Sequence, residues 1–259
     1  MDELVVTGRG AVATLVFNRP EKRNAISLDM WTALPGVLRE LASDSETRVL
    51  VIRGAGEEAF ASGADISEFE QVRSDAASAR RYSRIAEAAD RALAAFPRPT
   101  IAMIHGVCVG GGLELALACD LRFASSSARF GITAARLGII YGFSSTRRLA
   151  SIVGPSHARD ILFSGRLVGI DGARAMGLVN KVCEPETLEG ETYEYADRLA
   201  QQAPLSQRGA KLMLLHLLGE GEMTDTDLAA FVEQAYESED YHEGVRAFLE
   251  KRPPRFRGR

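Results

Sequence analysis

Three consecutive glycines, Gly110–Gly112, lie between an apolar segment and the residues LELALACD, and this part of the sequence is well suited to chemistry. Glycines let a ligand approach the main chain closely. The first N–H groups of a helix have no partner inside the helix and lie at its positive end. A strand ending near Gly106 and a helix opening at these glycines would stabilise developing negative charge on an oxygen. The alternative is a tight turn that binds nothing.

Glu114 follows Gly111 by three residues, on the same face of the predicted helix and one turn deeper. Its neighbours in the sequence are leucine and alanine, so this helix is predicted to be buried. A buried acid costs free energy unless it is paired or functional. Glu114 is therefore a candidate acid or base, and the alternative is a structural carboxylate facing Arg122 or Arg136.

A second turn lies in FASGADISEF, residues 60–69. Here Ala64 could present its backbone N–H, while Asp65 could cap the helix that follows. One N–H from Ala64 and one from Gly111 would make a two-donor oxyanion hole, in which loss of one donor typically costs ~10²–10³ in rate.

The elements that must position these turns follow from the apolar patterns. A β-hairpin is predicted around Gly8 and Gly10, which are flanked by the runs LVVTG and AVATLVFN. Ser27 is expected to cap an amphipathic helix, in which Pro35 indicates a kink or a frayed start. Further strands are expected at 48–54, 99–107, 120–125 and 128–131, with helices at 76–96 and 111–120. From residue 144 onward the signals are almost all helical, so the sequence predicts an α/β core, residues 1–195, and a C-terminal helical region, residues 196–259.

Composition narrows the functional classes. The chain has 259 residues and a net charge of −4, which argues against a nucleic-acid partner, although its last nine residues, KRPPRFRGR, are basic. Three cysteines without CxxC spacing fit buried thiols in a reducing compartment. With no signal-like N-terminus and no apolar run of ~18 residues, we expect a cytoplasmic protein with no membrane partner. The four histidines share no ligand spacing, so no metal is expected.

The two turns, in their order and spacing, resemble the crotonase superfamily, also called enoyl-CoA hydratase/isomerase. The matching segments are NRPEKRNAIS (18–27), FASGADISEF (60–69), IHGVCVGGGLELALACDLRFAS (104–125), RFGITAARLGI (129–139), RRLASIVG (147–154), ARAMGLVNKV (173–182) and FLEKRPPRF (248–256). They cover nearly the whole chain.

The resemblance implies a spiral core of repeated ββα turns, a C-terminal helical trimerisation region, and a homotrimer or a dimer of trimers. It implies an acyl-CoA substrate, with coenzyme A present only as part of the thioester and no separate cofactor. The amides matching Ala64 and Gly111 would hold the thioester oxygen. Residues expected to line the CoA and acyl path are Arg23, Ala25, Ala61, Gly63, Asp65, Ile66, Gly110 and Thr133, with Lys251 reaching the CoA of a neighbour.

The sequence departs from the family at one position. Hydratases of the family use two glutamates, of which one matches Glu114 and the other falls at Ala134, which cannot exchange protons. Tyr141 follows seven residues later, and a tyrosine at the matching place occurs in the family's methylmalonyl-CoA decarboxylases. Hydration or dehydration of an enoyl-CoA, with Glu114 handling water, is the leading expectation. Decarboxylation through Tyr141 and non-catalytic acyl-CoA binding are the alternatives.

Overall fold

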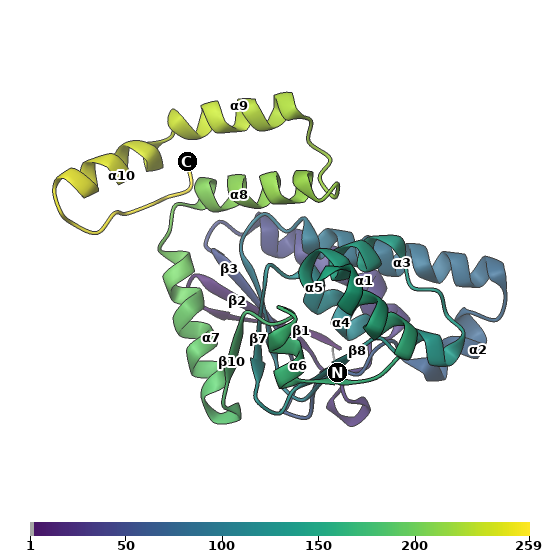
Figure 1. The fold of residues 1–259 in the computed structure, drawn as a ribbon. Helices are drawn as coiled ribbons and strands as arrows, with labels where there is room; N and C mark the ends of the chain where they lie inside the picture. Colours follow the sequence, from purple (N-terminus) through teal and green to yellow (C-terminus); the bar gives the residue numbers. More distant parts are fainter. Residues whose placement is uncertain (1–2) are drawn as a thin grey trace.

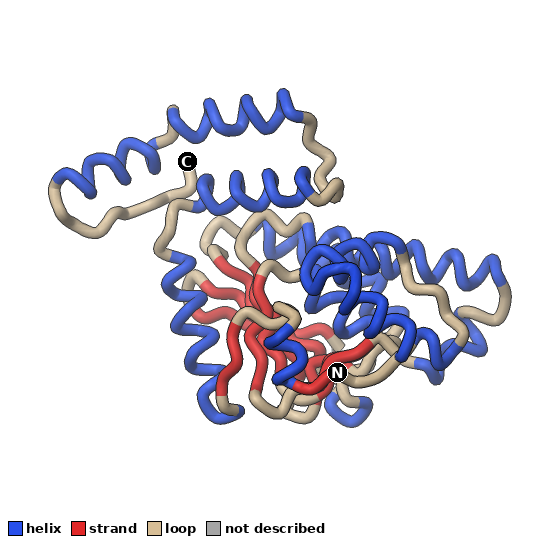
Figure 2. The backbone as a smooth tube through the Cα atoms, in the orientation of Figure 1, coloured by secondary structure: helices blue, strands red, loops and turns tan. Residues whose placement is uncertain are grey.

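Two β-sheets organise the chain, which a computed structural model describes for residues 3–259 (Figures 1 and 2). The six-stranded sheet has the order β1-β2-β3-β5-β7-β10, with β1 (Leu4–Arg9), β2 (Val12–Phe17), β3 (Val49–Gly54), β5 (Thr100–Ile104), β7 (Leu121–Ser125) and β10 (Lys181–Cys183). The four-stranded sheet has the order β4-β6-β8-β9, with β4 (Ala59–Ala61), β6 (Val107–Val109), β8 (Arg129–Gly131) and β9 (Val168–Gly169). The predicted hairpin is confirmed, because β1 pairs antiparallel with β2.

The central strands are parallel and buried on both faces. Strand β3 pairs in parallel with β2 and β5, and its residues 49–52 are fully buried. Leu50 and Ile52 face the main core under the N-terminal helices, whereas Val51 points to a second core with Leu188 and Tyr193 of the helix that covers the other face. Burial on both faces explains why the strand is a continuous β-branched and leucine run rather than an alternating one.

The described part of the chain contains ten α-helices, most of which pack around the sheets. They are α1 (Leu28–Ser43), α2 (Phe69–Val72), α3 (Ala76–Ala94), α4 (Gly111–Ala118), α5 (Phe143–Ser164), α6 (Ile170–Ala175), α7 (Pro185–Ala200), α8 (Pro204–Leu217), α9 (Asp225–Tyr236) and α10 (Glu239–Leu249). Short 3₁₀ helices are η1 (Pro20–Lys22), η2 (Ile66–Glu68) and η3 (Ala134–Leu137). Ser27 caps α1 as predicted, because its Oγ accepts the N–H of Met30 at 3.1 Å.

Two expectations about continuity differ from the structure. Helix α1 begins at Leu28 and continues past Pro35, so its start is not frayed, and the alternative of a kink at Pro35 stays a prediction. The single strand expected at 99–107 is two strands in different sheets, because the chain turns at Gly106. Gly106 has φ +52°, and a Cβ there would lie 1.9 Å from the carbonyl oxygen of Glu58. Only glycine tolerates both that backbone angle and that contact.

Other expectations differ from the structure in length. Within the region expected to be helical from residue 144 onward, α5 bends at Gly154 (φ 77°, ψ 157°). The strands β9 and β10, of two and three residues, interrupt a region expected to be helical. Such short strands carry too few residues for a period-two pattern, and their partners are far away in sequence.

Helices α9 and α10 extend away from the core, whereas α8 lies along it (Figure 1), with Leu215 packed on the main core and Lys211 paired with Asp120 at 2.9 Å. Helix α7 still packs on β2, β3, β5, β7 and β10, and the chain leaves the sheet between Ala200 and Pro204. The boundary expected between residues 195 and 196 stays a prediction, although α7 continues through it. Within residues 3–259, no helix combines the length and the apolar character needed to cross a membrane.

Candidate active site

The glycine turn joins β6 to α4 and depends on its lack of side chains. Gly110 adopts φ 51° and ψ −124°, and α4 begins at Gly111. A Cβ on Gly111 would lie 2.8 Å from the indole ring of Trp31, and one on Gly112 would lie 2.4 Å from the carbonyl oxygen of Ala61. The N–H of Gly111, the first of the helix, donates to no acceptor within residues 3–259.

The second turn follows β4 and faces the first. Ile26 donates its N–H to the carbonyl of Gly63 at 2.8 Å and accepts the N–H of Asp65 at 2.9 Å. The intervening N–H of Ala64 has no acceptor in the described chain. The two turns are close, because a Cβ on Gly111 would lie 3.6 Å from the Ala64 nitrogen, and one on Gly63 would lie 3.9 Å from the Gly111 nitrogen. Two unpaired amides therefore belong to adjacent turns.

Glu114 lies one turn into α4 and lines the same cavity as both turns. The side chain is partly accessible from the cavity, yet it is deeply enclosed by the protein. Burial and, to a lesser extent, the nearby Asp90 carboxylate raise the pKa of Glu114 to about 7, and they outweigh the hydrogen bonds from Ser145 and Tyr141 that favour the ionised form. Such a carboxyl group can both take up and release a proton near neutral pH.

Two hydroxyl groups hold the Glu114 carboxyl group. Ser145, in the first turn of α5, donates a short hydrogen bond to Oε1. Tyr141 Oη lies 3.3 Å from Oε2 and 2.9 Å from the carbonyl oxygen of Gly110, and burial keeps the pKa of this phenol well above its usual range. Sequence reasoning missed Ser145, since a serine near a helix start usually indicates only a cap.

Glu114 does not face the two arginines expected for a structural carboxylate. Among the described residues, no ion pair or hydrogen bond joins it to Arg122 or Arg136. Arg122 donates instead to the carbonyls of Leu178, at 2.8 Å, and Cys119, at 2.9 Å, and the side chain of Arg136 packs against Gly165. The carboxyl group of Glu114 is therefore satisfied only by hydroxyl groups and remains without a cation in contact. Its catalytic role stays a prediction.

The cavity has a volume of about 170 Å³. Of the residues expected from the sequence, it brings together Gly63, Ala64, Ile66, Gly110, Gly111, Glu114, Thr133 and Tyr141, along with Ala134. Its wall also contains side chains that sequence reasoning did not select, among them Trp31, Phe69, Arg73, Tyr82 and Glu87. Trp31 comes from α1 and Phe69 from α2, Arg73 directly follows α2, and Tyr82 and Glu87 come from α3. Packing of α1 on α3 brings these segments together.

Other expected residues lie outside this cavity. Ala25 and Ala61 are buried behind the turns, and Arg23 is exposed beside them. Asp65 is engaged in ion pairs with Arg19 at 2.9 Å and Lys22 at 2.8 Å. Burial opposes its ionisation, but those cations and the cap hydrogen bonds to Ser67 outweigh burial and hold its pKa far below the usual range. A role in binding stays a prediction for these four expected residues.

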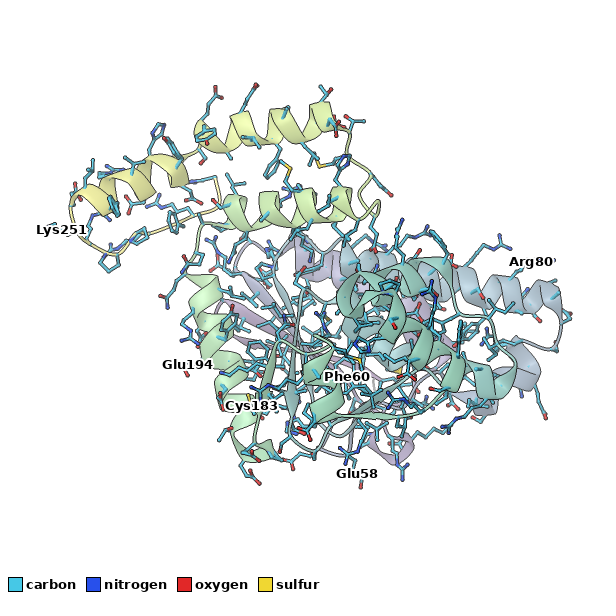
Figure 3. The ribbon with its side chains drawn as sticks, viewed as in Figure 1. Glu58, Phe60, Arg80, Cys183, Glu194 and Lys251 are labelled. Carbon is cyan, nitrogen blue, oxygen red and sulfur yellow. The ribbon has the colours of Figure 1, made fainter. Side chains whose placement is uncertain are left out.

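Lys251 lies far from the cavity of its own chain, at the end of α10 in the C-terminal extension (Figure 3). In the same view, Phe60 of β4, the strand before the second turn, lies in the core and is well separated from Lys251. Within residues 3–259, no three His, Cys, Asp or Glu side chains gather as metal ligands.

Fold and site together define an α/β protein that presents two main-chain amides and one enclosed carboxyl group to a small cavity, an arrangement suited to an enzyme. The chain belongs to the enoyl-CoA hydratase/isomerase family, whose model matches residues 7–259. The predicted crotonase-like fold and family are therefore confirmed.

Relatives of known name agree over nearly the full length. The short-chain-enoyl-CoA hydratase of Clostridium acetobutylicum is 35% identical over 257 residues, covering 97% of this chain and 96% of the relative. The crotonyl-CoA hydratase of Syntrophomonas wolfei is 34% identical and covers 98% of both chains. The crystal structure of an enoyl-CoA hydratase/carnithine racemase from Magnetospirillum magneticum matches with a TM-score of 0.94 at 36% identity, covering 100% of this chain and 97% of the other.

Proposed function

We propose that this enzyme adds water to a short-chain enoyl-CoA, and removes it in the reverse direction, through an enolate whose oxygen is held by the N–H groups of Ala64 and Gly111. The observation that carries the proposal is the pairing of these two free amides on adjacent turns, with Glu114 in the same cavity. Donors already in place where negative charge develops stabilise a transition state without reorganisation. The names of the relatives support an enoyl thioester as the substrate.

Glu114 would handle both protons in this mechanism. Its carboxylate takes a proton from water while the water oxygen bonds to the β carbon, and the electrons of the double bond move to the thioester oxygen as an enolate. The resulting carboxylic acid then returns a proton to the α carbon, which regenerates the carboxylate. A pKa of about 7 suits both steps, because the group is partly ionised at neutral pH and still acidic enough to donate.

The size of the cavity supports a short acyl chain. Its volume is only about 170 Å³, whereas small-molecule pockets typically measure ~300–1,000 Å³. Trp31, Phe69 and Tyr82 form its aromatic wall and limit the room for longer chains.

Decarboxylation of a malonyl-type thioester is the second candidate, and one observation favours it. Ala134 lines the cavity without a proton to exchange, whereas the Tyr141 hydroxyl touches Glu114. In that reaction the bond between the α carbon and its carboxylate breaks, CO₂ leaves, and the same amides hold the enolate. The enolate then takes a proton from the pair of Tyr141 and Glu114, so no base is needed to start the reaction.

We also propose a homo-oligomer, a trimer or a dimer of trimers, assembled through α8–α10. These helices enclose an apolar cavity of about 770 Å³, and Leu217, Phe248 and Leu249 expose large apolar side chains there or nearby. Exposed apolar surface of this kind is typical of a protein interface. Because Lys251 lies far from its own cavity, it would reach CoA only in a neighbouring subunit.

Rates on crotonyl-CoA and on methylmalonyl-CoA test the two reactions directly. We expect measurable hydration, and a loss of ~10²–10⁴ in rate for Glu114→Gln, the range typical of a general acid or base. Hydration that survives Glu114→Gln, or that Tyr141→Phe alone abolishes, would contradict these roles. CO₂ release from methylmalonyl-CoA without hydration of crotonyl-CoA would favour the second candidate, and tight binding without turnover of any acyl-CoA would indicate a non-catalytic binder.

A further inference from the structure

Two polar side chains in the described cavity wall are buried and lack a well-formed hydrogen bond. Trp31 is 1% exposed and Tyr82 is 6% exposed. Neither Trp31 Nε1 nor Tyr82 Oη makes a hydrogen bond of normal geometry among the described residues, although the indole N–H lies close enough to the phenol to lower its pKa. A buried donor without an acceptor costs free energy, and native proteins rarely leave one unused. Both side chains line the cavity that contains Glu114 and the two amides.

A cation lies beside these two donors. The guanidinium group of Arg73 stacks over the rings of Phe69 and Tyr82, with 4.7 Å from Cζ to each ring centre. Arg73 forms no ion pair among residues 3–259, and it is the only cation in the described lining of this cavity. Burial raises the pKa of Tyr82 to about 12, although Arg73 and the nearby indole N–H oppose the shift, so the phenol keeps its proton at neutral pH.

The acids near this wall do not neutralise Arg73. Glu68 accepts the backbone N–H of Leu28 at 2.9 Å. Glu114 is held by Ser145 and Tyr141. Glu87 lines the cavity near the start of α5, where its Oε1 lies 3.8 Å from the position of a Cβ on Gly142.

We propose that Trp31 Nε1, Tyr82 Oη and the Arg73 guanidinium, the donor cluster, bind a carboxylate carried by the acyl chain, so that the enzyme prefers a thioester of a short dicarboxylic acid. The inference rests on the proposed function, because it concerns the acyl group of the same substrate. Donors alone, with one of them cationic, match an anionic acceptor better than a methyl group or a neutral hydroxyl. A site built to hydrogen-bond a substrate group discriminates strongly against an analogue that lacks it, because the donors are then left unpaired.

A matched pair of substrates tests the preference. Glutaconyl-CoA and 2-pentenoyl-CoA have the same chain and double bond and differ only in a carboxylate or a methyl group at the end. The readout is the ratio of kcat/KM for hydration of the two. We expect wild type to favour glutaconyl-CoA at least 10-fold, and Tyr82→Phe or Arg73→Gln to reduce the ratio about 10-fold or more.

Arg174→Gln is the control for charge. Arg174 is an exposed residue of α6 and lines neither this cavity nor the pocket that adjoins it, so its loss should leave the ratio unchanged. A wild-type ratio near one, a preference for 2-pentenoyl-CoA, or an equal effect of Arg174→Gln and Arg73→Gln would overturn the proposal.

Binding of unreactive esters separates this inference from the proposed hydration. Calorimetric titration with glutaryl-CoA and with pentanoyl-CoA, which have no double bond, measures the preference without turnover. If neither enoyl ester is hydrated, the proposed function fails, but glutaryl-CoA should still bind wild type at least 10-fold more tightly than pentanoyl-CoA. Equal binding of the two esters would overturn the donor cluster even in an active hydratase.

Discussion

Removing the hydroxyl of Ser145 should shift the pH dependence of the enzyme. Ser145 donates to Oε1 of Glu114 and thereby favours the ionised carboxylate, which is the form that takes a proton from water. In Ser145→Ala the carboxylate loses this donor inside an enclosed cavity. The pKa of Glu114 should therefore rise above its value of about 7.

The size of the shift follows from the strength of the lost bond. A hydrogen bond to a charged group contributes ~1.5–3 kcal/mol, and one pKa unit corresponds to ~1.36 kcal/mol, so the pKa should rise by about 1–2 units. At pH 7 the ionised fraction would fall from about one half to about 1–10%, and kcat/KM for hydration would fall about 5- to 50-fold. The deficit should shrink as the pH approaches 9.

The assay is kcat/KM for crotonyl-CoA hydration between pH 5 and 9, followed by the absorbance of the enoyl thioester. Ser144→Ala is the matched control, since no hydrogen bond joins Ser144 to Glu114 among the described residues, and its profile should overlay that of wild type. The reasoning is refuted if the acidic limb of Ser145→Ala stays in place, or if the variant loses the same factor at every pH.

Three further changes have defined outcomes. Glu114→Gln, which should slow hydration ~10²–10⁴-fold, should also stabilise the fold at pH 8 by ~3 kcal/mol. The pKa of Glu114 is raised from 4.5 to about 7, so the wild-type fold loses stability as the pH rises between those values. Urea unfolding at pH 4 and pH 8 checks this, and a gain of equal size at both would contradict it. Ala134→Glu should raise kcat for crotonyl-CoA hydration about 10-fold or more by adding a second proton-transfer group to the cavity, and a slower or unchanged enzyme would show that Glu114 already suffices. Arg148→Met should lower the free energy of unfolding by ~3–5 kcal/mol, because Arg148 pairs with the buried Asp90 at 2.7 Å and with Glu220; a loss below ~1 kcal/mol in the same unfolding assay would argue against that network.

Local sequence patterns were sufficient to predict most strands and helices of the core. The hairpin around Gly10, the buried strand β3 and the cap at Ser27 follow from short-range rules that need no partner. Local patterns failed to predict the structure where contacts between residues far apart in the sequence decide the conformation. The split of the strand expected at 99–107 depends on the carbonyl of Glu58 facing Gly106, and the pairing of β10 with β7 depends on a strand about sixty residues away.

By itself the sequence determined the family, the two glycine-containing turns, the single acid at 114 and the missing acid at 134, because these depend on residue type and order. Only the tertiary structure decided what surrounds that acid. Ser145 and Tyr141 come from the segment around the start of α5. Trp31 comes from α1, Arg73 from the residue after α2, and Tyr82 from α3. Their hydrogen-bonding groups and charge act only at distances of a few ångströms, which are set by the packing of helices and not by spacing along the chain.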